Sequence, residues 1–196
     1  MAKIKTDTDK FSMAYLTGQT FLNLFIATLM SLILIVTFNF LFGDSGWVLF
    51  LTSVVCLWLD VGMVYQFMWR QADKEANYIH LGKVEKDSHK GVKVGLLAMI
   101  PYAALDVVLA LSMLKVIPFD FFPAFRLINA PLYGLMKMVQ PQGGVTTAEV
   151  AGLSWGGFAI VALLPLIYLL FCAAGYELGM RHISIKQKMM YKDQKK

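Results

Sequence analysis

The sequence predicts an all-α membrane protein: a four-transmembrane-helix bundle with an outer interfacial or re-entrant helical segment. Three observations lead to this prediction: four long apolar runs, a low content of charged residues, and an uneven distribution of lysine and arginine between the connections. Of the 196 residues, 58% are hydrophobic and 16% are charged, and the mean hydropathy is +0.60. A soluble domain has about 25% charged residues. A surplus of apolar surface on this scale needs lipid to cover it.

Four apolar runs are long enough to cross a hydrocarbon layer of ~30 Å, which takes about 20 helical residues. They cover approximately residues 20–42, 47–69, 94–114 and 155–175. Only Gly43-Asp44-Ser45-Gly46 separates the first two runs, and these residue types favour a tight reversal. We therefore expect an antiparallel hairpin followed by two more crossings, all within one integral membrane domain over residues 1–196.

The positions of lysine and arginine predict how the chain is oriented. The N-terminal segment has three of the 18 basic residues, the loop 70–93 has six, and the tail 181–196 has six. The turn after the first run has none, and segment 115–154 has three. Basic residues favour the cytoplasmic side of a membrane. An even number of crossings with the N-terminus inside puts fifteen of the 18 there, so we expect both termini in the cytoplasm.

Segment 115–154 is apolar enough to enter lipid, yet it does not suit a fifth crossing. Four prolines interrupt any long helix in it: Pro118, Pro123, Pro131 and Pro141. Arg126 and Lys137 would be costly at mid-bilayer, and a fifth crossing would move the basic tail outside. We expect either broken helices in the outer interface or a shallow re-entrant loop.

Two acidic residues lie deep within apolar runs, Asp60 in the second and Asp106 in the third. Helical rise places them ~14 Å and ~18 Å from the cytoplasmic edge, near the middle of the layer. A charged carboxylate at this depth costs at least about 2.5 to 3.5 kcal/mol, so each acid must face the bundle, be paired or be protonated. Small and polar residues share the helix faces of both acids. Helices two and three should therefore touch through this layer.

The four apolar runs contain no Lys, Arg or His, so neither acid has a basic partner at its own depth. Asp60, Asp106 and Tyr102, which lies one turn from Asp106, are candidates for a proton or ion site between the second and third helices. The alternative is a pair of protonated, hydrogen-bonded acids that only holds the helices together.

Other chemistry has little support in the sequence. It shows no cofactor fingerprint, no nucleophile motif and no ligand set with metal spacing, so we expect no cofactor, no metal and no catalytic residue. Cys56 and Cys172 lie within apolar runs as small hydrophobic residues.

The net charge of +5 indicates attraction to anionic lipid headgroups at the cytoplasmic face, and not to nucleic acid. The residues expected to anchor the tail to lipid are Arg181, Lys186, Lys188, Lys192, Lys195 and Lys196.

Glycines and prolines predict how the last helices pack. Gly-x-x-x-Gly occurs as Gly152 to Gly156 and as Gly175 to Gly179, and this spacing allows two helices to approach closely. We favour contacts within the chain over oligomerisation. Pro101 and Pro165 fall inside the third and fourth runs and should kink them.

Two stretches carry a family resemblance. At Gly91-Val-Lys-Val-Gly-Leu-Leu-Ala-Met-Ile-Pro101, and again at Gly175-Tyr-Glu-Leu-Gly-Met-Arg-His-Ile-Ser184 with its lysine-rich tail, the chain resembles small uncharacterised multi-pass membrane proteins of bacteria. The resemblance implies a bacterial plasma membrane and no activity.

The small size, the short loops and the missing chemical motifs favour a non-enzymatic role, as an accessory or scaffolding subunit that packs against another membrane protein or against itself. The alternative is a small proton- or cation-coupled transporter or channel that uses Asp60 and Asp106. A membrane-embedded hydrolase that uses the same two aspartates is a third hypothesis, without supporting motifs.

Overall fold

The structure is a computed structural model that describes residues 10–42, 46–140 and 149–183. Every regular element within these ranges is helical, and four segments there are long and apolar enough to cross a membrane. The four segments are α2 (Met13–Phe42), α3 (Gly46–His80), α4 (Lys90–Met113) and a broken helix composed of α7 (Trp155–Leu163) and α8 (Leu166–Met180). The predicted all-α class is confirmed, and the four apolar helices are those of a candidate membrane protein.

Two of the helices extend well past the apolar runs that predicted them. α2 begins at Met13 instead of near residue 20, and α3 continues beyond its apolar run to His80, the helical extension that the residues before the turn near Gly82 predict. Hydropathy marks only the lipid-like part of a helix, whereas residues 70–80 are polar helix formers without glycine or proline. α3 ends near Gly82, whose left-handed backbone with φ of +67° suits a helix C-terminus. The connection predicted over 70–93 therefore shortens to residues 81–89.

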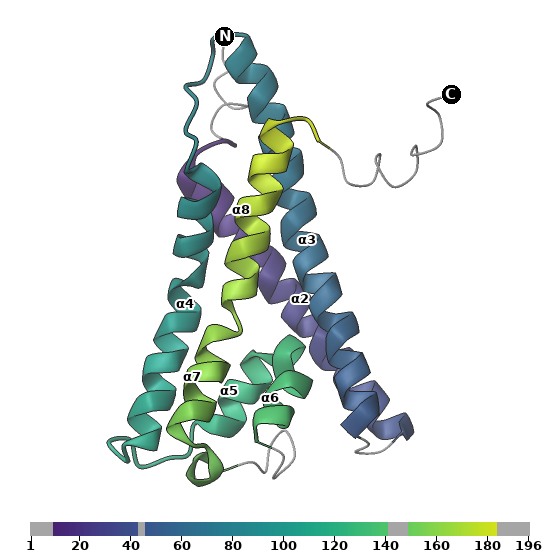
Figure 1. Cartoon of the computed structure of the whole chain (residues 1–196), viewed down its shortest axis with the longest axis vertical. Coiled ribbons are helices and arrows are strands. Elements are labelled where there is room, and N and C mark those ends of the chain that lie inside the picture. The colour runs from purple at the N-terminus through teal and green to yellow at the C-terminus, as the bar shows by residue number, and fades with distance from the viewer. Residues whose placement is uncertain (1–9, 43–45, 141–148, 184–196) are drawn as a thin grey trace.

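The long helices converge at one end of the molecule and spread apart at the other (Figure 1). We name the narrow end, where α3 ends and α4 begins, the apex, and the broad end, where α2 ends and α3 begins, the base. α8 packs against both α3 and α4, while α2 crosses diagonally and also contacts both. Within the described residues α3 and α4 make little direct contact. The prediction that the second and third helices touch through a shared layer is wrong, because α8 lies between them.

Glycines allow α8 to approach its two neighbours closely. A Cβ added at Gly175 would lie 2.8 Å from the Tyr65 carbonyl oxygen of α3, and one added at Gly95 of α4 would lie 2.6 Å from the Leu169 side chain of α8. The Gly175 to Gly179 motif therefore packs within the chain, as expected. Gly156 of the other motif has only the Ser154 hydroxyl near it, at 4.0 Å, and packs against no other helix.

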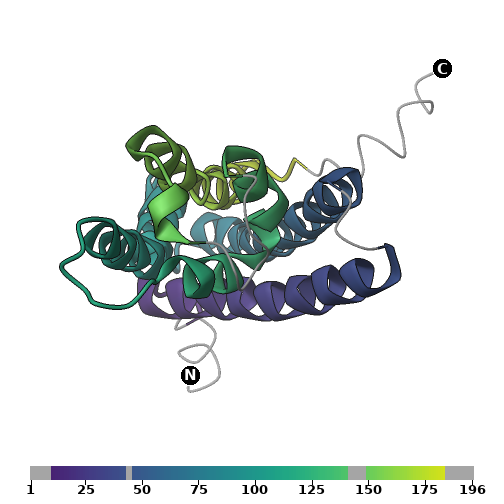
Figure 2. The same ribbon diagram turned by 90° about the horizontal axis from the view of Figure 1, so that it is seen from below.

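The spread between the helices at the base is filled by short helices of segment 115–154. They are α5 (Phe122–Ile128), η1 (Ala130–Leu132), α6 (Tyr133–Val139) and η2 (Val150–Gly152). The first three lie among the long helices when the molecule is viewed from below (Figure 2). The Gly134 amide donates a hydrogen bond of 2.6 Å to the Ser53 hydroxyl, about two turns or ~10 Å into α3. The predicted broken helices are present, and they enter the bundle instead of lying across its end.

The two intrahelical prolines have different effects. Pro165 separates α7 from α8, because proline lacks the amide hydrogen that would continue the backbone ladder. α4 continues as one helix through Pro101.

Cys56 and Cys172 are both free and buried, which confirms their expected role as small hydrophobic residues.

We expect Gly175→Leu to destabilise the bundle, whereas Gly156→Leu should not. Overpacking a close helix contact costs about 1–3 kcal/mol, because α8 would have to move away from the Tyr65 carbonyl. Thermal unfolding of the purified chain in a neutral detergent, followed by circular dichroism, measures the difference. Equal melting temperatures for the two variants would contradict the close contact between α8 and α3.

Candidate functional site

Asp60 lies in the centre of the bundle on the inner face of α3, with 1% of its surface exposed. Its carboxylate accepts a hydrogen bond of 3.3 Å from the Ser31 hydroxyl of α2 and one of 3.2 Å from the Tyr168 hydroxyl of α8. Ser53 and Cys56 on the same stripe of α3 are buried too, so the predicted inward face is confirmed. Each carboxylate oxygen thus has a hydroxyl donor, and the three helices are joined in one polar layer.

Tyr102 of α4 extends this polar layer toward the surface. Its ring centroid lies 5.9 Å from that of Tyr168, the residue that hydrogen-bonds Asp60. Tyr102 and Thr28 also line a groove of about 590 Å³ between α2, α4 and α5 whose other lining residues are apolar. Tyr102 at the wall of this groove is thus a ring neighbour of Tyr168, which hydrogen-bonds the buried carboxylate of Asp60.

Asp106 is not part of this layer. It is half-buried on the face of α4 that carries the buried residues Met99 and Leu109. Its Oδ1 atom is buried and has no hydrogen-bond partner in the described part of the chain, so it does not bond Tyr102. The structure brings Asp60 and Tyr102 into one neighbourhood through Tyr168, but it joins Asp106 to neither by a hydrogen bond. A shared proton or ion site of all three stays a prediction.

Sequence reasoning missed a second buried polar cluster, which lies at the apex. Glu75 of α3 is 0% exposed and forms an ion pair with Lys90, the first residue of α4. The Tyr176 hydroxyl of α8 donates a hydrogen bond of 2.9 Å to the other oxygen of Glu75. Both charged residues fall in the connection predicted over residues 70–93, for which no buried ion pair was expected. The available signal was the helical spacing of Met68, Ala72 and Ala76, which continues the buried stripe of α3 past Glu75.

The beginning of the C-terminal tail is attached to α3 at the apex. The Trp69 indole donates a hydrogen bond of 2.8 Å to the Ile183 carbonyl, and the His182 ring nitrogen lies 2.8 Å from an Asp73 carboxylate oxygen. His80 stacks on His182 at 6.3 Å between ring centroids. Among the described residues no group of three or more His, Cys, Asp and Glu could hold a metal ion.

The lipid-anchoring role of the tail lies mostly outside the described residues, because Lys186, Lys188, Lys192, Lys195 and Lys196 all fall beyond residue 183. Arg181 is described: it is exposed and pairs with Glu177 one turn earlier, at 2.6 Å. Its contact with lipid stays a prediction.

Arg126 shows how the base accommodates a cation among apolar helices. It is 0% exposed, and its guanidinium donates a hydrogen bond of 2.9 Å to the Gln140 carbonyl. The guanidinium also lies 4.5 Å from the centroid of the Phe122 ring, a cation–π contact. Burial lowers the pKa of Arg126, and the nearby Tyr133 acts in the opposite direction. The cost expected for this residue in lipid is reduced because protein groups surround it.

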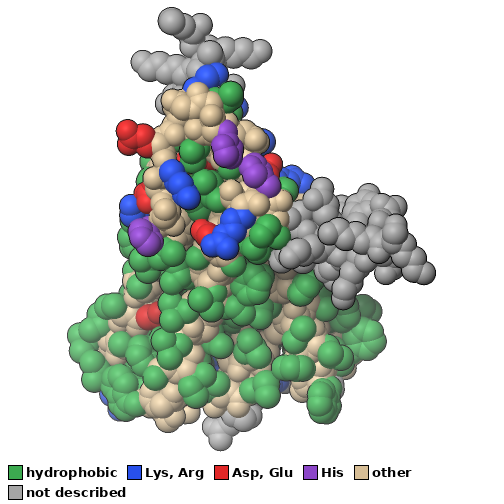
Figure 3. Space-filling model, turned by 45° about the horizontal axis from the view of Figure 1, so that its top comes forward, with side chains coloured by type: hydrophobic (Ala, Val, Ile, Leu, Met, Phe, Trp, Pro, Cys, Tyr) green, Lys and Arg blue, Asp and Glu red, His purple; other side chains and the backbone are tan. Residues whose placement is uncertain are grey.

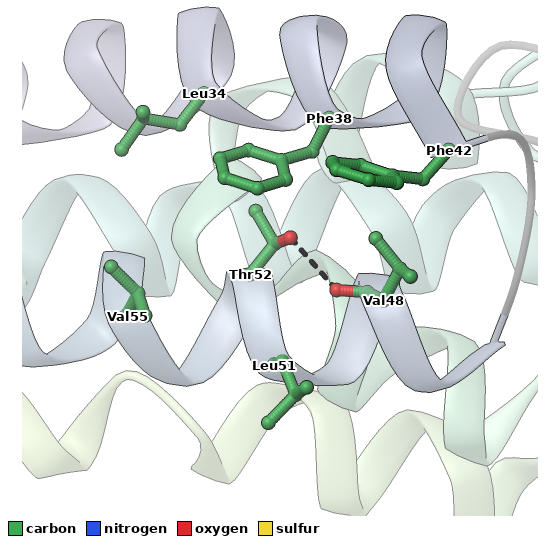
Figure 4. A pocket seen from close by; sticks show the side chains of 7 residues that line it. All are labelled: Leu34, Phe38, Phe42, Val48, Leu51, Thr52 and Val55. Atoms are coloured by element: carbon green, nitrogen blue, oxygen red, sulfur yellow. Dashed lines mark hydrogen bonds between the residues drawn. The ribbon is translucent and has the colours of Figure 1, made fainter.

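One further hollow, of about 230 Å³, lies between α2 and α3 near the base (Figure 4). Its lining is apolar apart from Thr52, whose hydroxyl donates a hydrogen bond of 2.7 Å to the Val48 carbonyl of its own helix. Phe38 and Phe42 stack along its α2 side at 5.8 Å between centroids. The hollow therefore directs no free polar group at a substrate.

No protein-family model, curated protein or solved structure matches the chain. Its function is accordingly inferred from its own residues and their geometry.

Glu75→Gln should destabilise the protein far more than Glu177→Gln. Removing one partner of a buried ion pair costs about 3–5 kcal/mol because the other charge is left uncompensated, and Lys90 is buried beside Glu75. The Glu177 pair is exposed, and such pairs contribute at most about 1 kcal/mol. Denaturant unfolding in detergent micelles compares the two variants. The double variant Glu75→Gln/Lys90→Met should recover part of the loss, and a Glu75→Gln variant as stable as Glu177→Gln would contradict a stabilising apex cluster.

Proposed function

We propose that the protein is an integral membrane protein of a bacterial plasma membrane, with four crossings and both termini in the cytoplasm. Two observations support this. The four helices are long and apolar enough to cross a membrane. Charged and histidine side chains gather toward the apex, whereas hydrophobic side chains cover the broad end of the molecule (Figure 3). In the proposed orientation the apex faces the cytoplasm and the base faces outward, which agrees with the tendency of basic residues to stay inside.

In this orientation α5, η1 and α6 form a re-entrant segment in the outer leaflet. The observation behind this choice is the hydrogen bond between Gly134 and Ser53, ~10 Å into α3. Non-helical backbone at membrane depth is tolerated where protein buries it, and Ala130, Leu132 and Tyr133 are all buried.

Within that membrane, we propose a non-enzymatic role as an accessory subunit that packs against another membrane protein. The observation that carries this proposal is the carboxyl group of Asp106, which has a buried oxygen without a hydrogen-bond partner among the described residues. Lipid tails offer no donor, and polar groups inside a membrane normally pair with one another or with another helix. Two exposed apolar residues of α4, Ile100 and Val107, share a face next to that of Asp106. Oδ1 itself is closed to an outside group, so a transmembrane helix with a basic, hydroxyl or amide side chain would donate to the other oxygen of this half-buried carboxyl group, whose charge Oδ1 shares.

Photo-crosslinking in native membranes tests this role. A photoreactive residue at Val107, which is 59% exposed beside Asp106, should capture a membrane protein. Adding Asp106→Leu should abolish that adduct, because the partner's polar group would lose its acceptor. The matched control carries the photoreactive residue at Trp58 of α3, which is 79% exposed and should give lipid adducts that Asp106→Leu leaves unchanged. Mass spectrometry identifies the adducts. The subunit role fails if Val107 yields only lipid, or if its protein adduct survives Asp106→Leu.

As a second candidate we propose a pathway for protons or monovalent cations through the Asp60 layer. The neighbouring rings of Tyr102 and Tyr168 and the hydrogen bond from Tyr168 to Asp60 favour it, because hydroxyl groups next to a carboxylate can relay a proton or coordinate a cation. Asp106, which lies one helical turn after Tyr102 on α4, would then be a second site that binds the proton or cation.

Liposomes that contain the purified chain and a pH-sensitive dye separate the two candidates. A pathway through this layer predicts a proton or cation flux that Asp60→Asn abolishes, because the amide cannot carry the negative charge. The control is Glu177→Gln, which removes an exposed carboxylate at the apex and should leave the flux unchanged. Liposomes as impermeable as empty ones would eliminate the second candidate and leave the subunit role untouched.

A further inference from the structure

A polar pocket of about 340 Å³ lies between α2 and α3, apart from Asp60 and Asp106. Two basic and three amide side chains line it, together with one thioether and one phenyl ring. The lining residues are Arg70, Lys74, Asn23, Gln66, Gln71, Met63 and Phe67. It is the most polar of the hollows described above, and no acidic residue lines it. Such a combination of positive charge and amide groups fits an anion that is rich in oxygen.

The two cations of this pocket are available to a ligand. Arg70 and Lys74 lie one turn apart on α3, so their side chains share a helix face. Neither forms a salt bridge with any acidic residue in the described ranges, where the ion pairs are those of Lys90, Lys93, Arg181 and His182. The nearby acids of α3, Asp73 and Glu75, are already paired with His182 and Lys90. A phosphate group matches this arrangement, because arginine binds it with a planar fork and lysine as a point charge.

The depth of the pocket identifies the source of the phosphate. Helical rise from the base places Asn23 ~28 Å from the end of α2 at Phe42, and Gln66 ~30 Å from the start of α3 at Gly46. The hydrocarbon core of a bilayer is ~30 Å thick. These are lengths along tilted helix axes, but the second apolar run also ends at residue 69, next to Arg70, so both observations favour a pocket near the phospholipid headgroups on the apex side.

Apolar surface continues from the pocket toward the base. Met63 and Phe67 form part of the lining itself. On α2, the exposed side chains of Ile26, Met30 and Ile33 follow Asn23 at helical spacing. A ligand with an anionic head and long acyl chains could place its phosphate against Arg70 and Lys74 and its chains along this stripe.

We propose that this pocket binds the phosphate of an anionic glycerophospholipid from the leaflet at the apex. The site is separate from the basic tail and from the accessory role proposed through Asp106. It rests on the chain crossing the membrane, and it holds whether or not Asp106 has a partner. Lysines and arginines on an open surface would attract any anionic membrane without binding a fixed number of lipids. Here three amide groups surround the same hollow as the two cations, so we expect one lipid molecule per chain.

Native mass spectrometry of the full chain in a neutral detergent tests the proposal, with phosphatidylglycerol and phosphatidylcholine as probes. One phosphatidylglycerol molecule should bind in preference to phosphatidylcholine. Arg70→Gln/Lys74→Gln should weaken its binding about thirtyfold, from the contribution expected of two basic residues. The control, Lys83→Gln/Lys86→Gln, removes the same charge from the neighbouring connection, outside the pocket, and should leave the affinity unchanged.

A second variant and a soluble competitor exclude simpler explanations. Asn23→Leu keeps every charge and removes one amide group from the pocket, so it should also weaken phosphatidylglycerol binding, with an unchanged melting temperature as the control for folding. Equal losses in the two double variants would show general charge attraction and overturn the proposal. Equal binding of phosphatidylcholine would also overturn it. If inorganic phosphate at millimolar concentration displaces the lipid, the site belongs to a soluble anion and the lipid assignment is wrong.

Discussion

The close approach of α8 to α3 on one side and to α4 on the other is the constraint on which the remaining structure depends. Gly175 and Gly179 remove the side chains that would separate α8 from α3, and Gly91 and Gly95 do the same between α4 and α8. In lipid the hydrophobic effect does not drive helices together, so close van der Waals contact and interhelical hydrogen bonds must do so. With α8 wedged between them, α3 and α4 meet near the apex through Glu75 and Lys90, make little other contact within the described residues, and diverge toward the base. The short helices α5 and α6 fill the space that this divergence opens.

The same helix arrangement determines where acidic residues can be buried. Asp60 and Glu75 each lie where three helices meet. Asp60 lies where α2, α3 and α8 meet and receives a hydroxyl from each neighbour. Glu75 lies where α3, α4 and α8 meet and has both Lys90 and Tyr176. Asp106 differs, since the base is wide at its level and no hydroxyl or cation of the described chain reaches its buried oxygen. For this reason we propose the accessory role through Asp106 and the relay through Asp60, although both are aspartates for which the sequence predicted a similar depth.

The sequence could predict the features that depend on composition along one helix. Four apolar runs gave the spanning segments, and helical spacing gave the inward face of Asp60. Neighbour relations between helices could not be derived in the same way. Asp60 and Asp106 were expected to meet because they share a depth, but depth says nothing about which helix lies between them. The Gly91 to Gly95 spacing was the available signal, since it marks a face of α4 that needs a close partner. Lys90 and Glu75 were missed because hydropathy assigns any charged stretch to solvent, whereas a long helix can carry a charge into the contact between its neighbours.

The basic residues that fixed the predicted orientation fall into two groups in three dimensions. Lys90, Lys93 and Arg181 each have an acidic partner, and the hydrogen bond from Lys93 lowers the pKa of Asp87. Their charges are largely cancelled within the protein. Arg70 and Lys74 have no acidic partner among the described residues, as is also true of Lys83 and Lys86, but Arg70 and Lys74 are exposed on one helix face and line one pocket. The count of lysines and arginines that predicted the orientation of the chain does not distinguish paired from unpaired residues. Their pairing instead supports the proposed lipid site, because only an uncancelled charge leaves a net field for a headgroup to satisfy, and Arg70 and Lys74 place two such charges in one pocket.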